Sequence, residues 1–272
     1  MSAEAVPRER LVEGRVAVVY GGGGALGGAV ARELAREGAR VFLAGRTLAP
    51  LQAAAAEITA AGGEAEVDTV DALDGAALER HADSVAARAG RIDVALNAIG
   101  VSHVQGVPLA ELSEEDFFHP VDVYLRSNFL TSKAVARHMT GRGSGVILVL
   151  NPPGARLTSA GFLGHGAACA AVEAFSRLLA CELGPSGVRV VCIRSHAVPE
   201  ALAAGSYTNE LFTKLANGAP LDDFMAKMAG GTLLRRLPTL EQLAGTAAFL
   251  ASDRAGAMTG TVANLTSGFA VD

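Results

Sequence analysis

Short apolar runs alternate with longer helical patterns along most of the chain. The runs are rich in β-branched residues and are bounded by glycines or polar turns, which predicts buried strands. The predicted strands are 15–20, 40–44, 64–70, 92–96, 145–150, 188–193 and 261–265. The segments between them predict helices, one ending near 37 and the others covering 49–61, 74–89, 113–139, 168–183 and 239–252. This alternation predicts an α/β fold, a doubly wound parallel sheet of about seven strands with helices on both faces.

Polar residues mark two of the predicted helix starts. Ser113 stands three residues before Asp116, a spacing that resembles a capping box. Thr239 is the expected N-cap of the last helix. Pro120 is expected to lie at an irregular start of the long helix, because proline removes a helical donor.

The same pattern sets the expected domain organisation. No change in composition divides the chain, so residues 14–272 are predicted to form a single domain, preceded by a polar N-terminal extension at 1–13. Residues 198–231 interrupt the rhythm of strands and helices. Long connections of this kind are often functional, and we predict that this one forms a substrate loop or lid.

Composition narrows the classes of partner. The 272-residue chain has a formal net charge of −5 and no basic stripe, which argues against nucleic-acid binding. No apolar run is long enough to cross a bilayer, and the polar N-terminus does not resemble a signal peptide. Three cysteines without paired spacing argue against a disulfide framework. We therefore expect a soluble, cytoplasmic protein that acts on a small-molecule substrate and binds neither nucleic acid nor membrane.

Glycines gather between the first predicted strand and the first helix. Glycine permits a tight turn there and lets backbone N–H groups approach a pyrophosphate at the helix N-terminus. The alternative is a purely structural turn, but a position after a strand and before a helix favours a dinucleotide site of the Rossmann type. The predicted contacts in this loop are Gly21, Gly23, Gly24, Leu26 and Gly27.

The end of the second strand indicates which dinucleotide is preferred. NAD-selective sites offer a carboxylate to the ribose 2′-hydroxyl at this point, whereas here Gly45 is followed by Arg46. A guanidinium pairs well with a 2′-phosphate, so NADP(H) is favoured over NAD(H). The alternative is that Arg46 is an ordinary surface cation.

These motifs resemble the short-chain dehydrogenase/reductase family over nearly the whole chain. Gly21, Ala25 and Gly27 fall on the family's G-x-x-x-G-x-G, with alanine at the middle glycine. Residues 93–100 resemble D-x-x-x-N-N-A-G and keep Asn97, while 184–190 resemble G-x-x-G-I-R-V. The resemblance implies a homodimer or homotetramer through helices 113–139 and 168–183. It also implies further cofactor contacts from Asp71, Ala72, Asn97, Gly100, His196 and Val198.

The family's catalytic tyrosine and the lysine four residues on are absent. Alignment of the helix places His165 and Cys169 at these two positions. No alternative pair exists, because none of the three tyrosines precedes a lysine by four residues. The tyrosines are Tyr20, Tyr124 and Tyr207, and the lysines are Lys133, Lys214 and Lys227. The family's serine is replaced by Asn151 in one alignment and by Pro152 in the other, and Asn128 matches the asparagine of its proton relay.

The replacement has a chemical rationale. A tyrosine with a pKa of about 10 needs a neighbouring cation to act as a base near neutrality, whereas histidine sits near 6.5 unaided. The resulting hypothesis makes His165 the proton carrier, Asn151 a polariser of the substrate oxygen and Asn128 the holder of a relay water. The alternatives are a structural His165 in an inherited cleft and a merely buried Cys169. A zinc site on His165, Cys169 and His196 would lack a fourth ligand, so no metal is expected.

Three functions remain open from the sequence. The first is an atypical NADP(H)-dependent oxidoreductase that transfers hydride to or from a small carbonyl or alcohol. The second is a non-redox enzyme, an isomerase, dehydratase or cyclase, in which His165 moves a proton. The third is a catalytically inactive nucleotide-binding or regulatory protein. Fold alone does not choose among them.

Overall fold

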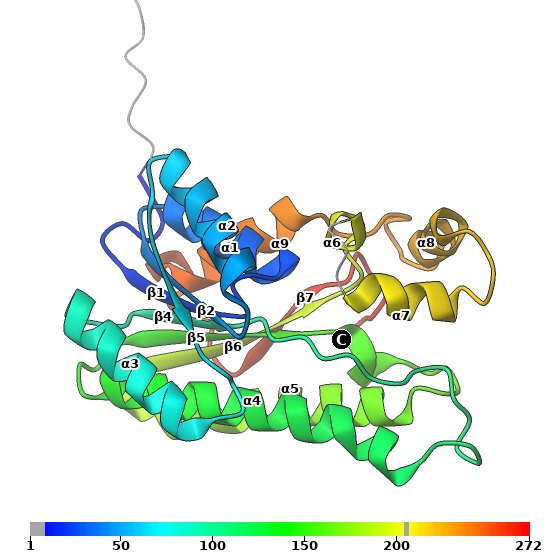
Figure 1. The fold of residues 1–272 in the computed structure, drawn as a ribbon. Helices are drawn as coiled ribbons and strands as arrows, with labels where there is room; N and C mark the ends of the chain where they lie inside the picture. The colour runs from blue at the N-terminus through cyan, green and yellow to red at the C-terminus, as the bar shows by residue number, and fades with distance from the viewer. Residues whose placement is uncertain (1–8, 204–206) are drawn as a thin grey trace, which may run out of the picture.

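A computed structural model describes residues 9–203 and 207–272. Within these ranges seven strands form one parallel sheet in the order β3-β2-β1-β4-β5-β6-β7 (Figure 1). The strands are β1 (Val16–Tyr20), β2 (Arg40–Gly45), β3 (Glu64–Thr69), β4 (Val94–Asn97), β5 (Gly145–Asn151), β6 (Val188–Ser195) and β7 (Thr261–Leu265). The predicted α/β class and doubly wound sheet are confirmed. The strand order reverses between β1 and β4, and ligands bind at such switch points, beyond the carboxyl ends of the strands.

Helices cover both faces of the sheet (Figure 1). One layer holds α1 (Ala25–Arg36), α2 (Leu48–Ala60) and α9 (Leu240–Ala251), and the other α3 (Gly75–Ala89), α4 (Glu114–Thr140) and α5 (Leu163–Leu183). Short 3-10 turns are η1 (Pro153–Arg156), η2 (Gly184–Ser186) and η3 (Asp253–Ala255). Strand β1 explains why both faces are covered: Val19 packs into the core beneath α1 and α9, whereas Val18 packs into the core beneath α3, α4 and α5. Successive side chains of a strand point to opposite faces, so a continuous apolar run needs two layers of cover.

Two helix boundaries differ from the predictions. Helix α5 begins at Leu163 rather than 168, which places His165 in its first turn. Gly164 and Gly166 are poor helix formers and hide this turn in the sequence. Pro120 lies inside α4 rather than at an irregular start, while the predicted caps Ser113 and Thr239 do accept backbone N–H groups at their helix starts.

The segment 198–231 folds into short helices beyond the ends of β6 and β7 (Figure 1). They are α6 (Pro199–Ala203), α7 (Tyr207–Leu215) and α8 (Leu221–Gly230). The rings of Phe212 and Phe224 lie 6.0 Å apart and join α7 to α8. Residues 204–206 lie outside the described residues, and the assignment of this segment as a substrate loop stays a prediction.

The N-terminal segment is described from residue 9 onward, and residues 1–8 of the predicted extension lie outside the described part. Val12 is buried, and the Leu11 backbone N–H donates to Glu37 Oε2 at 3.0 Å. Among the described residues, no helix has both the length and the apolar character needed to cross a bilayer.

Candidate active site

Two glycines give the loop after β1 its shape. Gly21 has φ +83°, and a Cβ there would lie 2.6 Å from the Ala98 carbonyl oxygen. A Cβ on Gly27 would collide with the Gly21 carbonyl oxygen. The loop therefore passes tightly over the end of β4 and against α1, as the glycine spacing predicts.

The loop leads into an uncapped helix. Gly24 is the N-cap of α1 and supplies no side-chain acceptor, and the first turn of the helix carries no acidic residue. The backbone N–H groups of this turn thus lack side-chain partners. Such a helix N-terminus is suited to the pyrophosphate of a dinucleotide.

The predicted adenosine-side residues lie at the ends of β2 and β3. Arg46 is exposed just beyond β2 and makes no ion pair with any residue that the structure describes. Asp71 is exposed after β3, where its Oδ1 accepts from the Leu73 backbone N–H at 3.0 Å. Ala72 follows it, half-buried. Arg46 is therefore free to pair with an anion at the sheet edge.

Asn97 has its amide occupied. At the end of β4, its Oδ1 accepts from the Ile99 backbone N–H at 3.1 Å, and its Nδ2 donates to Thr131 Oγ1 on α4 at 3.0 Å. The buried side chain therefore fixes the loop that continues through Gly100. The sequence predicts that Asn97 contacts the cofactor. In the structure, the side-chain hydrogen bonds of Asn97 shape this loop.

Asn128 lies on α4 with one polar atom unpaired. Its Nδ2 donates to the Tyr124 carbonyl at 2.9 Å. Its Oδ1 is buried and has no hydrogen-bond partner among the described residues. Buried acceptors are nearly always satisfied, so this oxygen marks a place for a water or another donor, as the relay hypothesis requires.

A pair of histidines occupies the start of α5. His165 is buried, 6% exposed, and its Nδ1 lies 2.9 Å from Nε2 of His103, with the two rings nearly parallel at 11°. Sequence reasoning missed His103. The available signal was its place three residues after Gly100, in the loop that follows β4, where side chains gather at the carboxyl edge of the sheet.

Three hydrogen bonds hold the loop that carries His103. His103 Nδ1 contacts the Val101 carbonyl at 2.8 Å, and His119 Nε2 on α4 contacts the Ser102 carbonyl at 3.1 Å. The Gly106 backbone N–H donates to the Gly161 carbonyl at 2.8 Å. The loop is thereby tied to α4 and to the segment that leads into α5.

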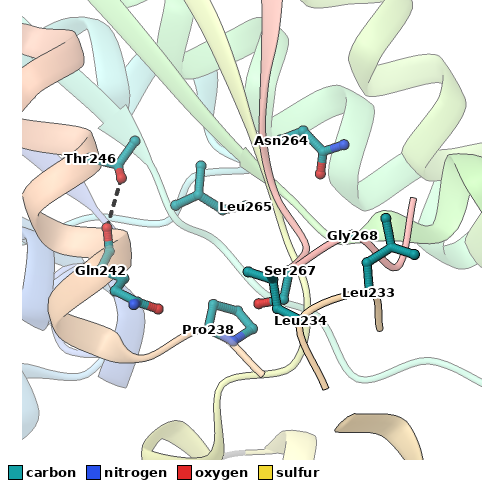
Figure 2. A pocket seen from close by; sticks show the side chains of 9 residues that line it. All are labelled: Leu233, Leu234, Pro238, Gln242, Thr246, Asn264, Leu265, Ser267 and Gly268. Atoms are coloured by element: carbon teal, nitrogen blue, oxygen red, sulfur yellow. Dashed lines mark hydrogen bonds between the residues drawn. The ribbon is translucent and has the colours of Figure 1, made fainter. Parts of the chain in front are cut away.

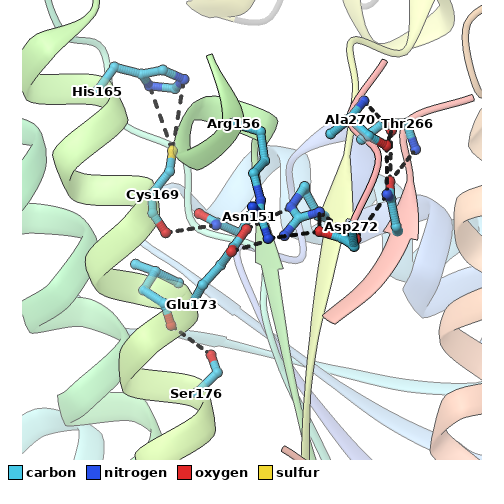
Figure 3. A network of polar contacts seen from close by, with 12 residues as sticks. Asn151, Arg156, His165, Cys169, Glu173, Ser176, Thr266, Ala270 and Asp272 are labelled. Carbon is cyan, nitrogen blue, oxygen red and sulfur yellow. Dashed lines mark hydrogen bonds and ion pairs between the residues drawn. The ribbon is translucent and has the colours of Figure 1, made fainter. Parts of the chain in front are cut away.

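His165, Cys169 and Asn151 follow one another in a series of polar contacts (Figure 3). Cys169 Sγ is 3.8 Å from His165 Nε2, and burial raises the pKa of the thiol to about 12. Asn151, at the end of β5, donates from Nδ2 to the Cys169 carbonyl at 3.0 Å. Cys169 is therefore a neutral, fully buried thiol, and the Asn151 amide is committed in part to the backbone of α5.

Burial also changes the titration of the histidines. Burial, and secondarily the neighbouring His103, lower the pKa of His165 to about 3. The value of about 6.5 belongs to an unaided histidine, and the sequence does not show how completely α5 and the loop enclose His165. Burial likewise lowers the pKa of His103, and that of His196 to about 4.

The structure thus brings His165, Cys169 and Asn151 together and adds His103. His196 lies at the end of β6, where its Nδ1 accepts from the Ala197 backbone N–H at 2.6 Å and its ring meets Phe269 edge-on. Val198 is buried just beyond it. In the described part of the chain, no cluster of three or more His, Cys, Asp or Glu side chains could hold a metal ion.

A separate cavity of about 420 Å³ lies between α9 and the loop after β7 (Figure 2). It is lined by Leu233, Leu234, Pro238, Gln242, Thr246, Asn264, Leu265, Ser267 and Gly268. None of the predicted site residues lines it. The cavity is therefore distinct from the histidine site.

The chain is similar to known reductases and dehydrogenases over nearly its full length. A family model described as enoyl-(acyl carrier protein) reductase matches residues 23–270. Short-chain reductase protein NovJ of Streptomyces niveus is 31% identical, with 98% of each chain covered. D-threitol dehydrogenase of Mycolicibacterium smegmatis is 30% identical, with 96% of this chain and 94% of that protein covered.

Solved structures of the same kind of enzyme superpose on this chain. A short-chain type dehydrogenase/reductase from Mycobacterium ulcerans is 30% identical and superposes with a TM-score of 0.84 over 95% of this chain and 90% of that one. The parallel seven-stranded sheet, the glycine loop and the extent of these matches lead to one assignment. The chain belongs to the short-chain dehydrogenase/reductase family of NAD(P)-dependent oxidoreductases.

Proposed function

We propose that this protein is an NADP(H)-dependent oxidoreductase that transfers hydride between the nicotinamide and a small carbonyl or alcohol, with His165 in place of the family's tyrosine. One observation carries the proposal: the glycine loop and the imidazole of His165 lie at the same carboxyl edge of the sheet. Gly21 follows β1 there, and Asn151 at the end of β5 donates to the carbonyl of Cys169, one turn of α5 after His165. The dehydrogenase and reductase relatives support the reaction class.

The bound nucleotide would supply or accept the hydride, and the chain's residues handle the proton. Neutral His165 accepts the hydroxyl proton of an alcohol, or returns it to the oxygen of a carbonyl. Asn128 Oδ1 holds a water through its unpaired lone pairs. Charging His165 is costly: a shift from about 6.5 to about 3 corresponds to roughly 5 kcal/mol. The imidazole therefore needs a neighbour that shares the proton.

Arg46 supports the preference for NADP(H). It is exposed beside Gly45 and makes no ion pair with any described residue, so no internal carboxylate competes for a 2′-phosphate. Arg46→Asp should raise the Kd for NADPH at least about tenfold, the loss of a charge-assisted contact, and should change the Kd for NADH far less. Fluorescence titration with both nucleotides measures this. Equal effects on the two nucleotides would remove the basis for the preference.

Turnover tests the reaction itself. Purified protein is assayed with NADP⁺ and NADPH against panels of polyols, secondary alcohols and ketones, alongside His165→Phe and the control His138→Phe at the far end of α4. We expect turnover in the wild type and the control, and a loss of about 10²-fold or more in His165→Phe, the usual contribution of a general acid–base. An activity that survives His165→Phe unchanged would contradict the role of His165.

An inactive nucleotide-binding protein is the second candidate, favoured by one observation. His165 is enclosed, strongly resists protonation and is already hydrogen-bonded within the protein. Tight NADPH binding with no turnover across the panels would favour this function.

A further inference from the structure

The contacts of His103 determine where the protons sit on the two imidazoles. Its Nδ1 is 2.8 Å from the Val101 carbonyl oxygen, which accepts only, so Nδ1 carries a hydrogen. A neutral His103 then has a lone pair on Nε2. Gln105 Nε2 lies 2.8 Å from the same atom, so its N–H shares this one lone pair with any other donor.

The tautomer of His165 follows from that lone pair. His165 Nδ1 lies 2.9 Å from His103 Nε2, so Nδ1–H of His165 is the donor. Its Nε2 is then the basic nitrogen, held on the side of Gly154 and Cys169. Which nitrogen of a histidine is basic is set by the hydrogen bond that the other nitrogen makes. His103 therefore determines that Nε2 is the basic nitrogen of His165.

The two histidines differ in enclosure. His165 is 6% exposed, whereas His103 is only half-buried, in a loop at the edge of the sheet. A positive charge is less costly where water is closer. A proton transferred from His165 to His103 therefore moves to the ring where a positive charge costs less free energy.

We propose that His103 is a positioning residue that fixes His165 as the Nδ1–H tautomer and takes over its proton, so that the two rings replace the missing tyrosine and lysine. This inference rests on the proposed function. In alcohol oxidation, the hydroxyl proton bonds to His165 Nε2 while the His165 Nδ1 proton moves to His103 Nε2. His165 ends neutral, and His103 ends as the imidazolium with its Nδ1–H still on Val101. The hydride leaves with the nucleotide, so charge and atoms balance.

The surroundings of His103 contain few other ionisable groups. From α4, His119 opposes a charge on it, and the Tyr124 ring lies 5.9 Å away, edge-on. From α5, His165 contacts His103, and the neutral thiol of Cys169 contacts the far nitrogen of His165. Among these contacts no carboxylate adjoins His103, so its charged form depends on water and on the Val101 carbonyl, while the Gln105 N–H opposes it.

Two variants separate positioning from proton transfer. In His103→Gln, the side-chain carbonyl reaches the place of Nε2 and accepts from His165 but cannot take up the proton. His103→Phe keeps the ring contacts and removes the acceptor. His138→Gln is the control, since His138 lies at the other end of α4 beside Asp83.

The direct readout is histidine-selective ¹⁵N NMR of the full chain, which has six histidines, with His165→Phe used for assignment. We expect the Nδ1–H tautomer of His165 in the wild type, in His103→Gln and in the control, and its loss in His103→Phe. On acid titration of the wild type, His103 should protonate before His165. A wild-type Nε2–H tautomer, or prior protonation of His165, would overturn the inference whether or not turnover is found.

Enzyme kinetics of the same variants test proton transfer through His103. We expect kcat to fall about 10²-fold in His103→Phe and about tenfold in His103→Gln, with a changed pH profile and an unchanged Kd for NADPH. Wild-type kcat and pH profile in both variants would exclude proton transfer through His103. Absence of turnover in the wild type would instead reject the proposed function, and the NMR result would then decide the positioning role alone.

Discussion

At the scale of single residues, enclosure governs the chemistry. The same burial that makes His165 resist a positive charge makes the Cys169 thiol resist ionisation. The protonation of His165 and Cys169 therefore differs from that of the same side chains in water. The place of His103 in the loop after β4 was a signal, but its pairing with His165 was not predictable, because the contact spans 62 positions and depends on the loop held by Val101 and Gly106. The glycines of the nucleotide loop were predictable, since a tight turn leaves a local signature.

Gly21 provides a test at this scale. A side chain there would meet the Ala98 carbonyl and would need a positive φ, which costs an L-residue about 1–2 kcal/mol. Gly21→Ala should lower the Tm and raise the Kd for NADPH about tenfold or more. Its control, Gly245→Ala, places a Cβ in open space on α9 and should raise stability by up to about 1 kcal/mol. Unaltered NADPH binding in Gly21→Ala would show that the loop does not hold the pyrophosphate.

At the scale of elements, an ion-pair network around the buried Arg194 and Glu173 ties α5, β6 and Asp272 together (Figure 3). Arg194 on β6 is 1% exposed, and its guanidinium pairs with both oxygens of Glu173 and both oxygens of Asp272. Arg156 from η1 also pairs with Asp272. The network thus anchors the middle of α5 directly below Cys169, and with it the turn that carries His165.

Removing one partner of this network should show how much the network contributes to the free energy of unfolding. Glu173→Ala leaves half of a buried guanidinium unpaired and should cost about 3–5 kcal/mol. Glu57→Ala, which breaks a surface pair with Arg32, should cost less than about 1 kcal/mol. Urea unfolding of both variants measures the difference. Equal losses in the two variants would show that the buried network contributes no more than a surface pair.

Acid should weaken the same anchor. The hydrogen bond from Arg194 lowers the pKa of Asp272 below its usual value of 3.8. A lowered pKa adds stability above the unfolded value, and that stability is lost as the pH falls through the lower folded value. The stability difference between wild type and Asp272→Asn should therefore be constant above about pH 5 and shrink below about pH 4. A pH-independent difference in urea unfolding would contradict this linkage.

Element boundaries show where sequence reasoning succeeds and where it fails. The starts of α4 and α9 were predictable because Ser113 and Thr239 carry capping side chains. The start of α5 was not, because Phe162 makes no side-chain cap and two glycines follow within four residues. Tertiary contacts hold that turn instead: a Cβ on Gly164 would lie 2.8 Å from the Phe117 carbonyl oxygen of α4.

At the scale of the whole molecule, α4 and α5 form one outer layer with exposed apolar side chains. Phe129 is 51% exposed and Leu178 is 70% exposed. We therefore keep the prediction that two copies pair through these helices. Leu178→Glu should shift the protein to a monomer in sedimentation, while Leu233→Glu, beside the separate cavity, should leave that dimer contact intact. A wild-type monomer, or a Leu178→Glu protein of unchanged size, would reject this interface.

In the proposed function, a nicotinamide hydride moves in this site while His165 accepts or donates the proton. The most direct measurement is a single turnover with NADPH deuterated at C4, followed by mass spectrometry of the reduced product, in wild type and His165→Phe. We expect deuterium on the product carbon in the wild type and a rate about 10²-fold lower in His165→Phe. Product without deuterium, or an equal rate in the two proteins, would contradict it.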